Sequence, residues 1–201
     1  MKRMYALLLV LVVVVFSASC QKQAVASNPA VSPSTVSAQA LMVPEAWYFA
    51  EFERLGFSVF RNNPDFPKLD FYDFSGKKYT ISDFSGKVIL FNIWATWCPP
   101  CRMEIPSIQK LHDTITSDKF MILAVSTGEK AQTVSDFIKE NKHTFPVFLD
   151  PSSSIGSQLA NRGIPTTYII GKTGKIIAAT IGARSYDGPE FIKLINKLVS
   201  E

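Results

Sequence analysis

The sequence predicts an α/β domain in which a mixed central sheet is flanked by helices. Two observations support this prediction. In the first half of the domain, apolar runs of strand length alternate with segments whose apolar residues recur at helical spacing. In the second half, two short apolar runs on either side of a glycine-containing turn are followed by one last amphipathic segment. Strands that alternate with helices favour parallel pairing, and a closing hairpin adds antiparallel strands, so we expect both kinds in one sheet.

The individual elements follow from their residue patterns. Residues 69–74 and 78–81 are expected to form an N-terminal hairpin around Gly76, and the apolar run at 88–94 predicts a buried strand. The other expected elements, in chain order, are a helix with Ile105, Ile108, Leu111 and Ile115 on one stripe, a strand at 119–125, a helix at 131–141, a short apolar stretch at 145–149, a short helix at 151–162, a hairpin of 167–170 and 175–179, and a helix at about 189–199.

Residues 1–20 have the pattern of a secretory signal, with a basic start, an apolar run and small residues before Cys20. A small-residue triplet that ends in cysteine resembles a bacterial lipobox, and this resemblance implies that Cys20 is lipidated. Ser17 departs from the common pattern, which has leucine there. A plain cleaved signal and an uncleaved anchor remain alternatives. All three interpretations predict a domain outside the cytoplasm, on or near a membrane.

Two further segments precede the domain. Residues 21–43 are rich in Ser, Ala, Pro, Gln and Val and predict a flexible tether. Residues 44–65 form an aromatic-rich extension in which a short helix is expected to begin at Pro44 and end at Gly56. Its aromatic side chains either pack against the domain or form a docking surface for a membrane or a partner protein. The domain itself is expected to span residues 66–201.

Two cysteines lie where the strand at 88–94 gives way to a helix. Cys98 and Cys101 fall in the first turn of that helix, where the helix dipole favours a thiolate. The thiolate is the species that attacks disulfides, so this arrangement favours a redox pair over a structural disulfide. A zinc site would need more ligands, and the sequence offers only His112, His143 and Cys20 besides this pair. We therefore expect no metal and no cofactor other than the two sulfurs.

The segment from Trp94 to Cys101, together with Glu104 and Pro106, resembles the active site of extracytoplasmic thioredoxin-like proteins, specifically the TlpA/ResA/CcmG-type thiol–disulfide oxidoreductases. The resemblance covers about residues 66–200. It implies a thioredoxin-like fold with an N-terminal β-hairpin and, at residues 145–162, a central β-α insertion. Cys98, at the exposed tip of the helix, is then expected to be the nucleophile, and Cys101 the resolving thiol.

The resemblance also indicates roles for neighbouring residues. Pro165 would lie in a cis-proline loop that faces the cysteines, and Ile164 would offer its backbone to a substrate strand. The alternative is an ordinary trans proline. Glu104 would relay the proton of Cys101, unless it is simply a solvated residue of the first helical turn. Three further residues are expected to bind substrate, namely Trp97, Pro99 and Pro100.

The function implied by the resemblance is the reduction of protein disulfides outside the cytoplasm, for example of apocytochrome c. A membrane electron donor of the CcdA/DsbD type would regenerate the dithiol. A thiol oxidase, a thiol peroxidase and a non-catalytic module that binds a metal or a partner remain alternatives. The formal net charge of +4, without a basic stripe that includes aromatic residues, argues against nucleic acid as a partner.

Overall fold

The computed structural model describes residues 46–201. The expected signal peptide at 1–20, the candidate lipidation site Cys20 and the tether at 21–43 lie outside the described residues. The described chain forms eight strands, five α-helices and one 3-10 helix. In chain order they are α1 (Tyr48–Arg54), β1 (Ser58–Val59), β2 (Phe71–Tyr72), β3 (Lys78–Tyr79), a 3-10 helix (Ile81–Phe84), β4 (Val88–Trp94), α2 (Pro99–Thr114), β5 (Phe120–Thr127), α3 (Ala131–Glu140), β6 (Val147–Asp150), α4 (Ser154–Leu159), β7 (Thr166–Ile170), β8 (Ile176–Ile181) and α5 (Pro189–Ser200).

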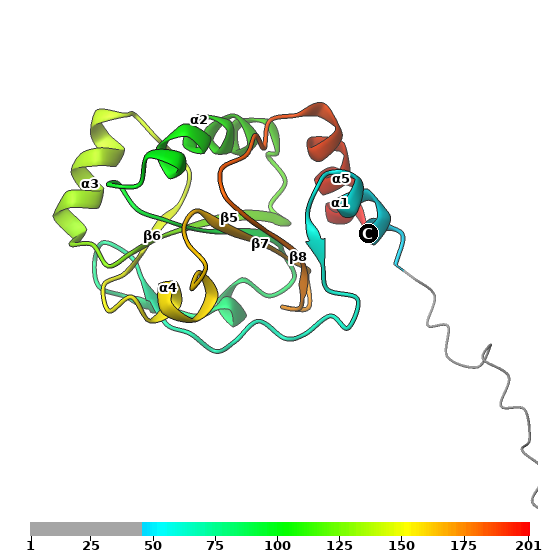
Figure 1. The fold of residues 1–201 in the computed structure, drawn as a ribbon, viewed down its shortest axis with the longest axis horizontal. Helices are drawn as coiled ribbons and strands as arrows, with labels where there is room; N and C mark the ends of the chain where they lie inside the picture. The colour runs from blue at the N-terminus through cyan, green and yellow to red at the C-terminus, as the bar shows by residue number, and fades with distance from the viewer. Residues whose placement is uncertain (1–45) are drawn as a thin grey trace, which may run out of the picture. The chain divides into compact units, whose positions relative to one another are not determined.

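The described strands form one mixed sheet in the order β1-β8-β7-β4-β5-β6-β2-β3. Strands β4, β5 and β6 are parallel, whereas β7 pairs antiparallel with β4, and β8 antiparallel with β7. Helices α2 and α3 cover one face of the sheet and α4 lies on the other (Figure 1). The expected α/β fold with a mixed sheet is therefore confirmed, including the hairpin of β2 and β3.

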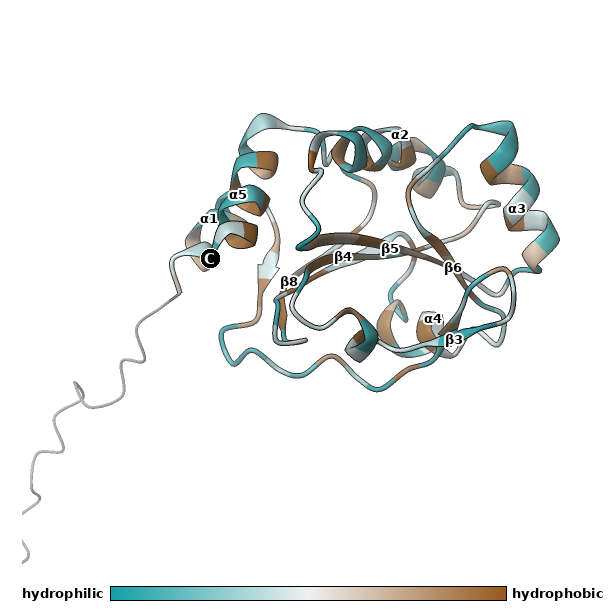
Figure 2. Ribbon diagram, turned by 180° about the vertical axis from the view of Figure 1, so that it is seen from behind, coloured by the Kyte–Doolittle hydropathy of each residue, from teal (hydrophilic) through white to brown (hydrophobic). Residues whose placement is uncertain are grey.

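Strand β4 lies inside the sheet and is buried along its whole length, and Figure 2 shows it in the apolar colour. Its side chains contribute to the cores on both faces of the sheet. Successive side chains of a strand point to opposite faces. Leu90 and Trp94 belong to the core beneath α2 and α5, while Phe91 and Ile93 belong to the core that includes Ile155 of α4. Asn92 alternates with the second pair, so its polar side chain points toward α2.

The aromatic extension packs onto the domain. Phe49 and Phe52 of α1 are buried, and Ser58 and Val59 of β1 pair with Ala179 and Ala178 of β8. Helix α1 begins at Tyr48, four residues after the expected start at Pro44. The ammonium group of Lys197 lies 3.6 Å from the centre of the Trp47 ring, so Trp47 contacts α5 from the position just before the helix.

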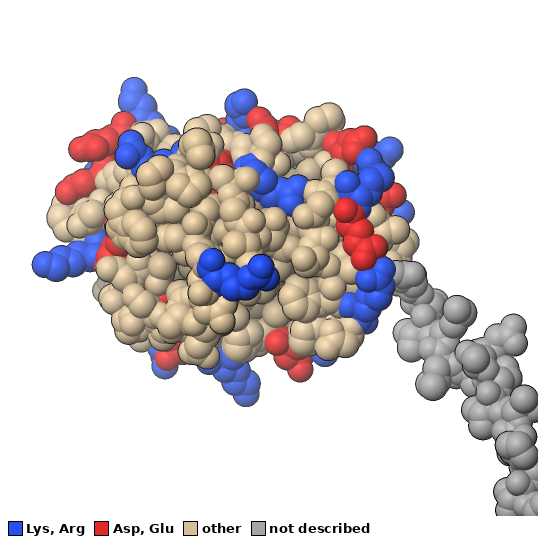
Figure 3. All heavy atoms as spheres, in the orientation of Figure 1, with Lys and Arg blue, Asp and Glu red and all other residues tan. Residues whose placement is uncertain are grey.

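Charged side chains of both signs are interspersed on the face of the described domain that Figure 3 presents. Large fields of one sign attract oppositely charged polymers, and none is visible on this face. Within residues 46–201, none of the helices has the length and apolar character needed to cross a membrane.

Candidate active site

The two cysteines lie at the junction of β4 and α2 and form a disulfide with a Cα–Cα distance of 5.3 Å. Cys98 is the N-cap of α2, and its Sγ accepts a hydrogen bond from the backbone N–H of Cys101 at 3.3 Å. Pro99 and Pro100 occupy the first two helical positions, where a missing N–H costs no intrahelical hydrogen bond. The helix N-terminus therefore points its dipole and a donor at the sulfur of Cys98.

A second loop closes over this sulfur. The peptide bond between Ile164 and Pro165 is cis, and the Ile164 carbonyl oxygen lies 3.7 Å from the Sγ of Cys98. The loop reaches this position because β7 runs antiparallel to β4, so that Thr166 pairs with Ile93. The carboxyl end of β4 and the amino end of β7 are thus neighbours in the sheet.

The expectation that Cys98 lies at an exposed tip of the helix is wrong. Cys98 is only 3% exposed and Cys101 is fully buried. The Ile164 carbonyl covers the first sulfur, which sequence spacing alone could not predict. Around this covered sulfur, Trp97 is 66% exposed and Pro99 is also exposed, so they form the accessible rim of the site.

Glu104 lies one helical turn after Cys101 and is only 2% exposed, so it is not a solvated residue. Its Oε1 accepts a hydrogen bond from the Asn92 side chain at 2.7 Å, and its Oε2 accepts one from the Arg184 backbone N–H at 3.3 Å. Burial raises the pKa of Glu104 to about 7, while both hydrogen bonds and the charge of Arg184 act in the opposite direction. The carboxyl group can therefore gain or lose a proton near neutral pH.

A buried polar network surrounds this carboxyl group. Asn92 also donates to the hydroxyl of Thr167 at 2.8 Å, and the Tyr186 hydroxyl donates to the same oxygen at 2.7 Å. The Ser107 hydroxyl donates to the Glu104 backbone carbonyl at 2.7 Å. Tyr186 is fully buried, and this burial raises its pKa, so its hydroxyl stays protonated. Of these residues, only Asn92 has a signal in the sequence, as a polar residue inside an apolar run.

The sequence gives no indication of a role for Glu129, which holds the loop before the cysteines. Its carboxylate accepts hydrogen bonds from the Thr96 backbone N–H at 2.8 Å, from the Thr96 hydroxyl and from the Ser126 hydroxyl at 2.6 Å. These contacts join the segment just before Cys98 to the end of β5. The Thr96 hydroxyl is directed at this carboxylate.

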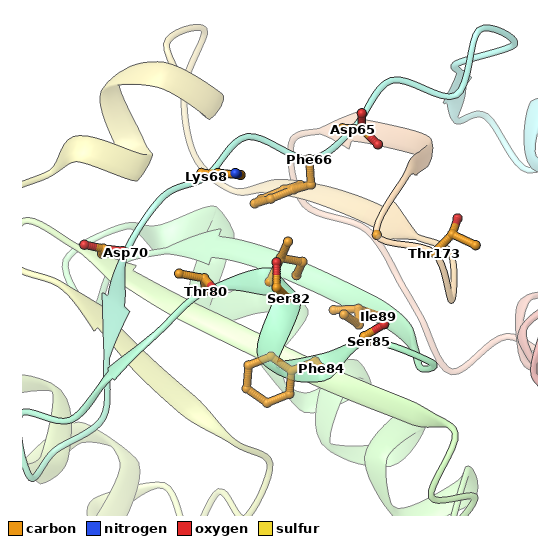
Figure 4. A pocket seen from close by; sticks show the side chains of 13 residues that line it. Asp65, Phe66, Lys68, Asp70, Thr80, Ser82, Phe84, Ser85, Ile89 and Thr173 are labelled. Carbon is orange, nitrogen blue, oxygen red and sulfur yellow. The ribbon is translucent and has the colours of Figure 1, made fainter.

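A pocket of about 560 Å³ is separate from the cysteines, because neither cysteine and no residue of α2 lines it. Figure 4 shows Lys68 and Asp70 at one end of it and Asp65 and Thr173 at the other, with Phe66 between them. Among the residues that the structure describes, no group of three or more His, Cys, Asp or Glu side chains is arranged to hold a metal ion.

Comparison with known proteins gives consistent results. The model of the AhpC/TSA family matches residues 61–179. A thiol-disulfide oxidoreductase ResA from a strain of Bacillus cereus is 30% identical over 138 residues, which cover 69% of this chain and 77% of the relative. The crystal structure of StoA from Bacillus subtilis is 28% identical with a TM-score of 0.54, covering 63% of this chain and 96% of StoA. A thiol:disulfide interchange protein of the thioredoxin family from Chlorobium tepidum TLS is 25% identical with a TM-score of 0.57, covering 68% of this chain and 97% of that one. The thioredoxin-like fold expected from the sequence is confirmed.

Proposed function

The chain belongs to the AhpC/TSA family and is a thiol–disulfide oxidoreductase of the ResA type, and we propose that it is a membrane-tethered reductase of protein disulfides outside the cytoplasm. One arrangement supports the proposal above all others. The Cys98–Cys101 disulfide lies at the start of α2, beside the cis Ile164–Pro165 peptide and one turn before the buried carboxyl group of Glu104.

The reaction begins with the dithiol form. The Cys98 thiolate attacks one sulfur of the partner's disulfide, and the partner's other sulfur leaves as a thiolate that takes up a proton. Cys101 then attacks the sulfur of Cys98 in the mixed disulfide and releases the second partner thiol. Two electrons have passed to the partner, and the enzyme is left with the Cys98–Cys101 disulfide described above.

Glu104 is suited to take the proton of Cys101 in the second step. A thiol must lose its proton to attack, and a buried carboxylate whose pKa is about 7 can accept it at neutral pH. The same group favours the reductive direction. Negative charge near the thiols disfavours their thiolate forms, and strong oxidants of this fold depend on a stabilised reduced form.

The partner surface follows from the geometry of the rim. An extended segment of the substrate would pair with the Ile164 backbone, in the manner of strand addition, while exposed Trp97, Pro99 and half-buried Pro100 contact its side chains. Apocytochrome c, whose haem-binding motif contains two nearby cysteines, is the substrate we propose. A membrane protein of the CcdA/DsbD type would return electrons, and no further cofactor is required.

The membrane tether is proposed from the sequence of the N-terminus, with Cys20 as the lipidated residue. Replacing Cys20 with alanine should release the protein from the membrane fraction and abolish labelling with a radioactive fatty acid. If the Cys20→Ala variant stays in the membrane fraction, the tether is an uncleaved anchor instead.

The decisive experiment for the direction of electron flow is the reduction potential of the Cys98–Cys101 pair. Equilibration with dithiothreitol and glutathione buffers, followed by thiol alkylation and mass analysis, gives this value. A potential near or below about −230 mV agrees with a reductase, whereas one near about −120 mV is that of a strong oxidant and would refute the proposal.

The substrate is tested with a trapping variant. Cys101→Ser retains the attacking thiol of Cys98 but cannot resolve the mixed disulfide, so it should accumulate a covalent adduct with an oxidised Cys-x-x-Cys-His peptide. The Cys98→Ser variant is the matched control and should form none. Equal adduct yields from an unrelated disulfide peptide would argue against apocytochrome c as the preferred substrate.

A further inference from the structure

One residue, Arg184, connects the N-terminal segment of residues 46–60 to the buried carboxyl group of Glu104. The Arg184 side chain donates a hydrogen bond through Nη2 to the carbonyl oxygen of Leu55, and its guanidinium carbon lies 3.9 Å from the centre of the Phe57 ring. Its backbone N–H donates to Oε2 of Glu104 at 3.3 Å. The side chain of Arg184 thus contacts the N-terminal segment, while its backbone N–H contacts the carboxyl group of Glu104.

The partners in the N-terminal segment are well suited to fix a guanidinium group. Leu55 is the C-cap of α1, and the last carbonyl groups of a helix lack intrahelical donors and attract cations. The ring of Phe57 is itself held in the core, stacked on Phe191 at 5.7 Å and against Phe52 at 5.4 Å. A cation over a fixed aromatic face is favourable, so the position of Arg184 depends on this segment.

We propose that Arg184 is a positioning residue through which the N-terminal segment sets the proton affinity of Glu104. The proposal rests on the role of Glu104 in the proposed function, and it adds a part of the chain that lies far from the cysteines in sequence. Movement of the segment would move the loop between β8 and α5, and with it both the backbone donor and the positive charge that face the carboxyl group.

The groups around Glu104 come from β4, from α2 and from the loop between β8 and α5. Asn92 of β4 donates to it and also to Thr167 of β7, while Cys101 precedes it by one turn in α2. Tyr186, in the same loop as Arg184, is buried and protonated at neutral pH. Arg184 is the cation that acts on the carboxylate, and both its charge and its N–H favour the ionised form.

No acidic side chain within residues 46–201 forms an ion pair with Arg184 that could hold it in place of the N-terminal segment. Its Nε is buried and has no hydrogen-bond partner in this part of the chain. The Leu55 carbonyl and the Phe57 ring therefore determine where the guanidinium group lies. Loss of either contact should let the loop relax and leave Glu104 with weaker stabilisation of its charge.

The test measures the ionisation of Glu104 directly. The infrared band of its protonated carboxyl group is followed from pH 5 to 9 in the oxidised, full-length protein, and the Glu104→Gln variant identifies the band. Arg184→Met, which keeps an unbranched stem but removes the guanidinium group and its charge, should shift the midpoint upward by about half a unit to one unit. Phe57→Leu should shift it in the same direction by a smaller amount.

Arg54→Met is the matched control. Arg54 is an exposed arginine of α1 that pairs with Glu51 of the same helix at 2.8 Å and links the N-terminal segment to the domain through Glu190 of α5 at 2.6 Å. Neither of these ion pairs involves the loop at Arg184. Its replacement should leave the midpoint unchanged. If Arg54→Met shifts the midpoint as far as Arg184→Met does, general loosening of the segment explains the effect and the inference is wrong.

The inference is also wrong if Arg184→Met and Phe57→Leu both retain the midpoint of the wild type. Should Arg184→Met fail to fold, Phe57→Leu alone decides. Because the readout is made on the oxidised protein without substrate, it is independent of the direction of electron flow. A strongly oxidising potential would refute the reductase proposal and leave this inference standing.

Discussion

Replacing Glu104 with glutamine should change how the stability of the protein depends on pH. Burial raises the pKa of Glu104 to about 7 from an ordinary value of 4.5. The folded protein therefore holds this proton more tightly than the unfolded chain does. The resulting stabilisation is fully present below pH 4.5 and is lost as the pH rises through 7. Glutamine has the same shape but does not ionise, so its contribution is constant.

The size of the effect follows from the same two values. At 1.36 kcal/mol per pKa unit, the full difference corresponds to about 3 kcal/mol, of which about 2.5 kcal/mol is lost between pH 5 and pH 8. Other titrating groups, such as half-buried His143, are present in both proteins and cancel in the comparison. The free energy of unfolding of the wild type should thus fall by about 2.5 kcal/mol more than that of Glu104→Gln over this range.

Urea unfolding of the oxidised proteins at pH 5 and pH 8, followed by circular dichroism, measures this difference. The disulfide remains closed at both values, so thiol ionisation does not contribute. A constant offset between the two proteins would reflect only the altered hydrogen bonds of glutamine. If the two stabilities change in parallel from pH 5 to pH 8, then the pKa of Glu104 in the folded protein lies near its ordinary value, and its carboxylate is too weak a base to hold the proton of Cys101 near neutral pH.

Three further outcomes are expected. Asn92→Leu removes a hydrogen bond to the ionised form of Glu104, so the infrared midpoint of that carboxyl group should rise above about 7, and an unchanged midpoint would contradict the network described here. Tyr186→Phe removes the hydrogen bond to Thr167 and should lower the free energy of unfolding by about 1 kcal/mol in urea titrations, whereas a neutral result would mean that this bond is not formed. Trp97→Ala should change the free energy of unfolding by no more than about 0.5 kcal/mol, because the side chain is 66% exposed. The variant should nevertheless reduce protein disulfides more slowly than the wild type, while it reduces a small aromatic disulfide at the same rate.

The central strand and its helix could be predicted because they are long and regular. Seven consecutive residues from Val88 to Trp94 gave the bounds of β4 without error, and the apolar stripe after the cysteines gave α2. The two-residue strand β1 was not predicted. Its pairing with β8 depends on residues about 120 positions later in the chain, and no local pattern contains that information.

The chemistry of the site was predictable only where it depends on local spacing. The positions of Cys98 and Cys101 at a helix start follow from the sequence, but the burial of Cys98 depends on a loop 66 residues away. Tyr186 and Arg184 lie in a connecting segment, where sequence reasoning expects exposed side chains. The burial of Tyr186 and the half-burial of Arg184 follow from the closeness of α2, α1 and the loop before α5, which is a property of the assembled fold alone.

Because β7 pairs antiparallel with β4, the register between these two strands determines whether the cis-proline loop lies beside the cysteines. In this register Thr167 lies beside Asn92, and Thr166 beside Ile93, so the cis peptide that precedes Thr166 falls next to the cysteines. A shift of one residue would turn every side chain of β7 to the opposite face and move the loop by about 3.4 Å. Such a shift would break the central hydrogen bonds of the sheet, which are among the last to open in a folded protein. The covering loop therefore stays beside the reactive sulfur for as long as β4 and β7 remain paired. The backbone amides of these two strands should exchange with deuterium only as fast as the whole protein unfolds.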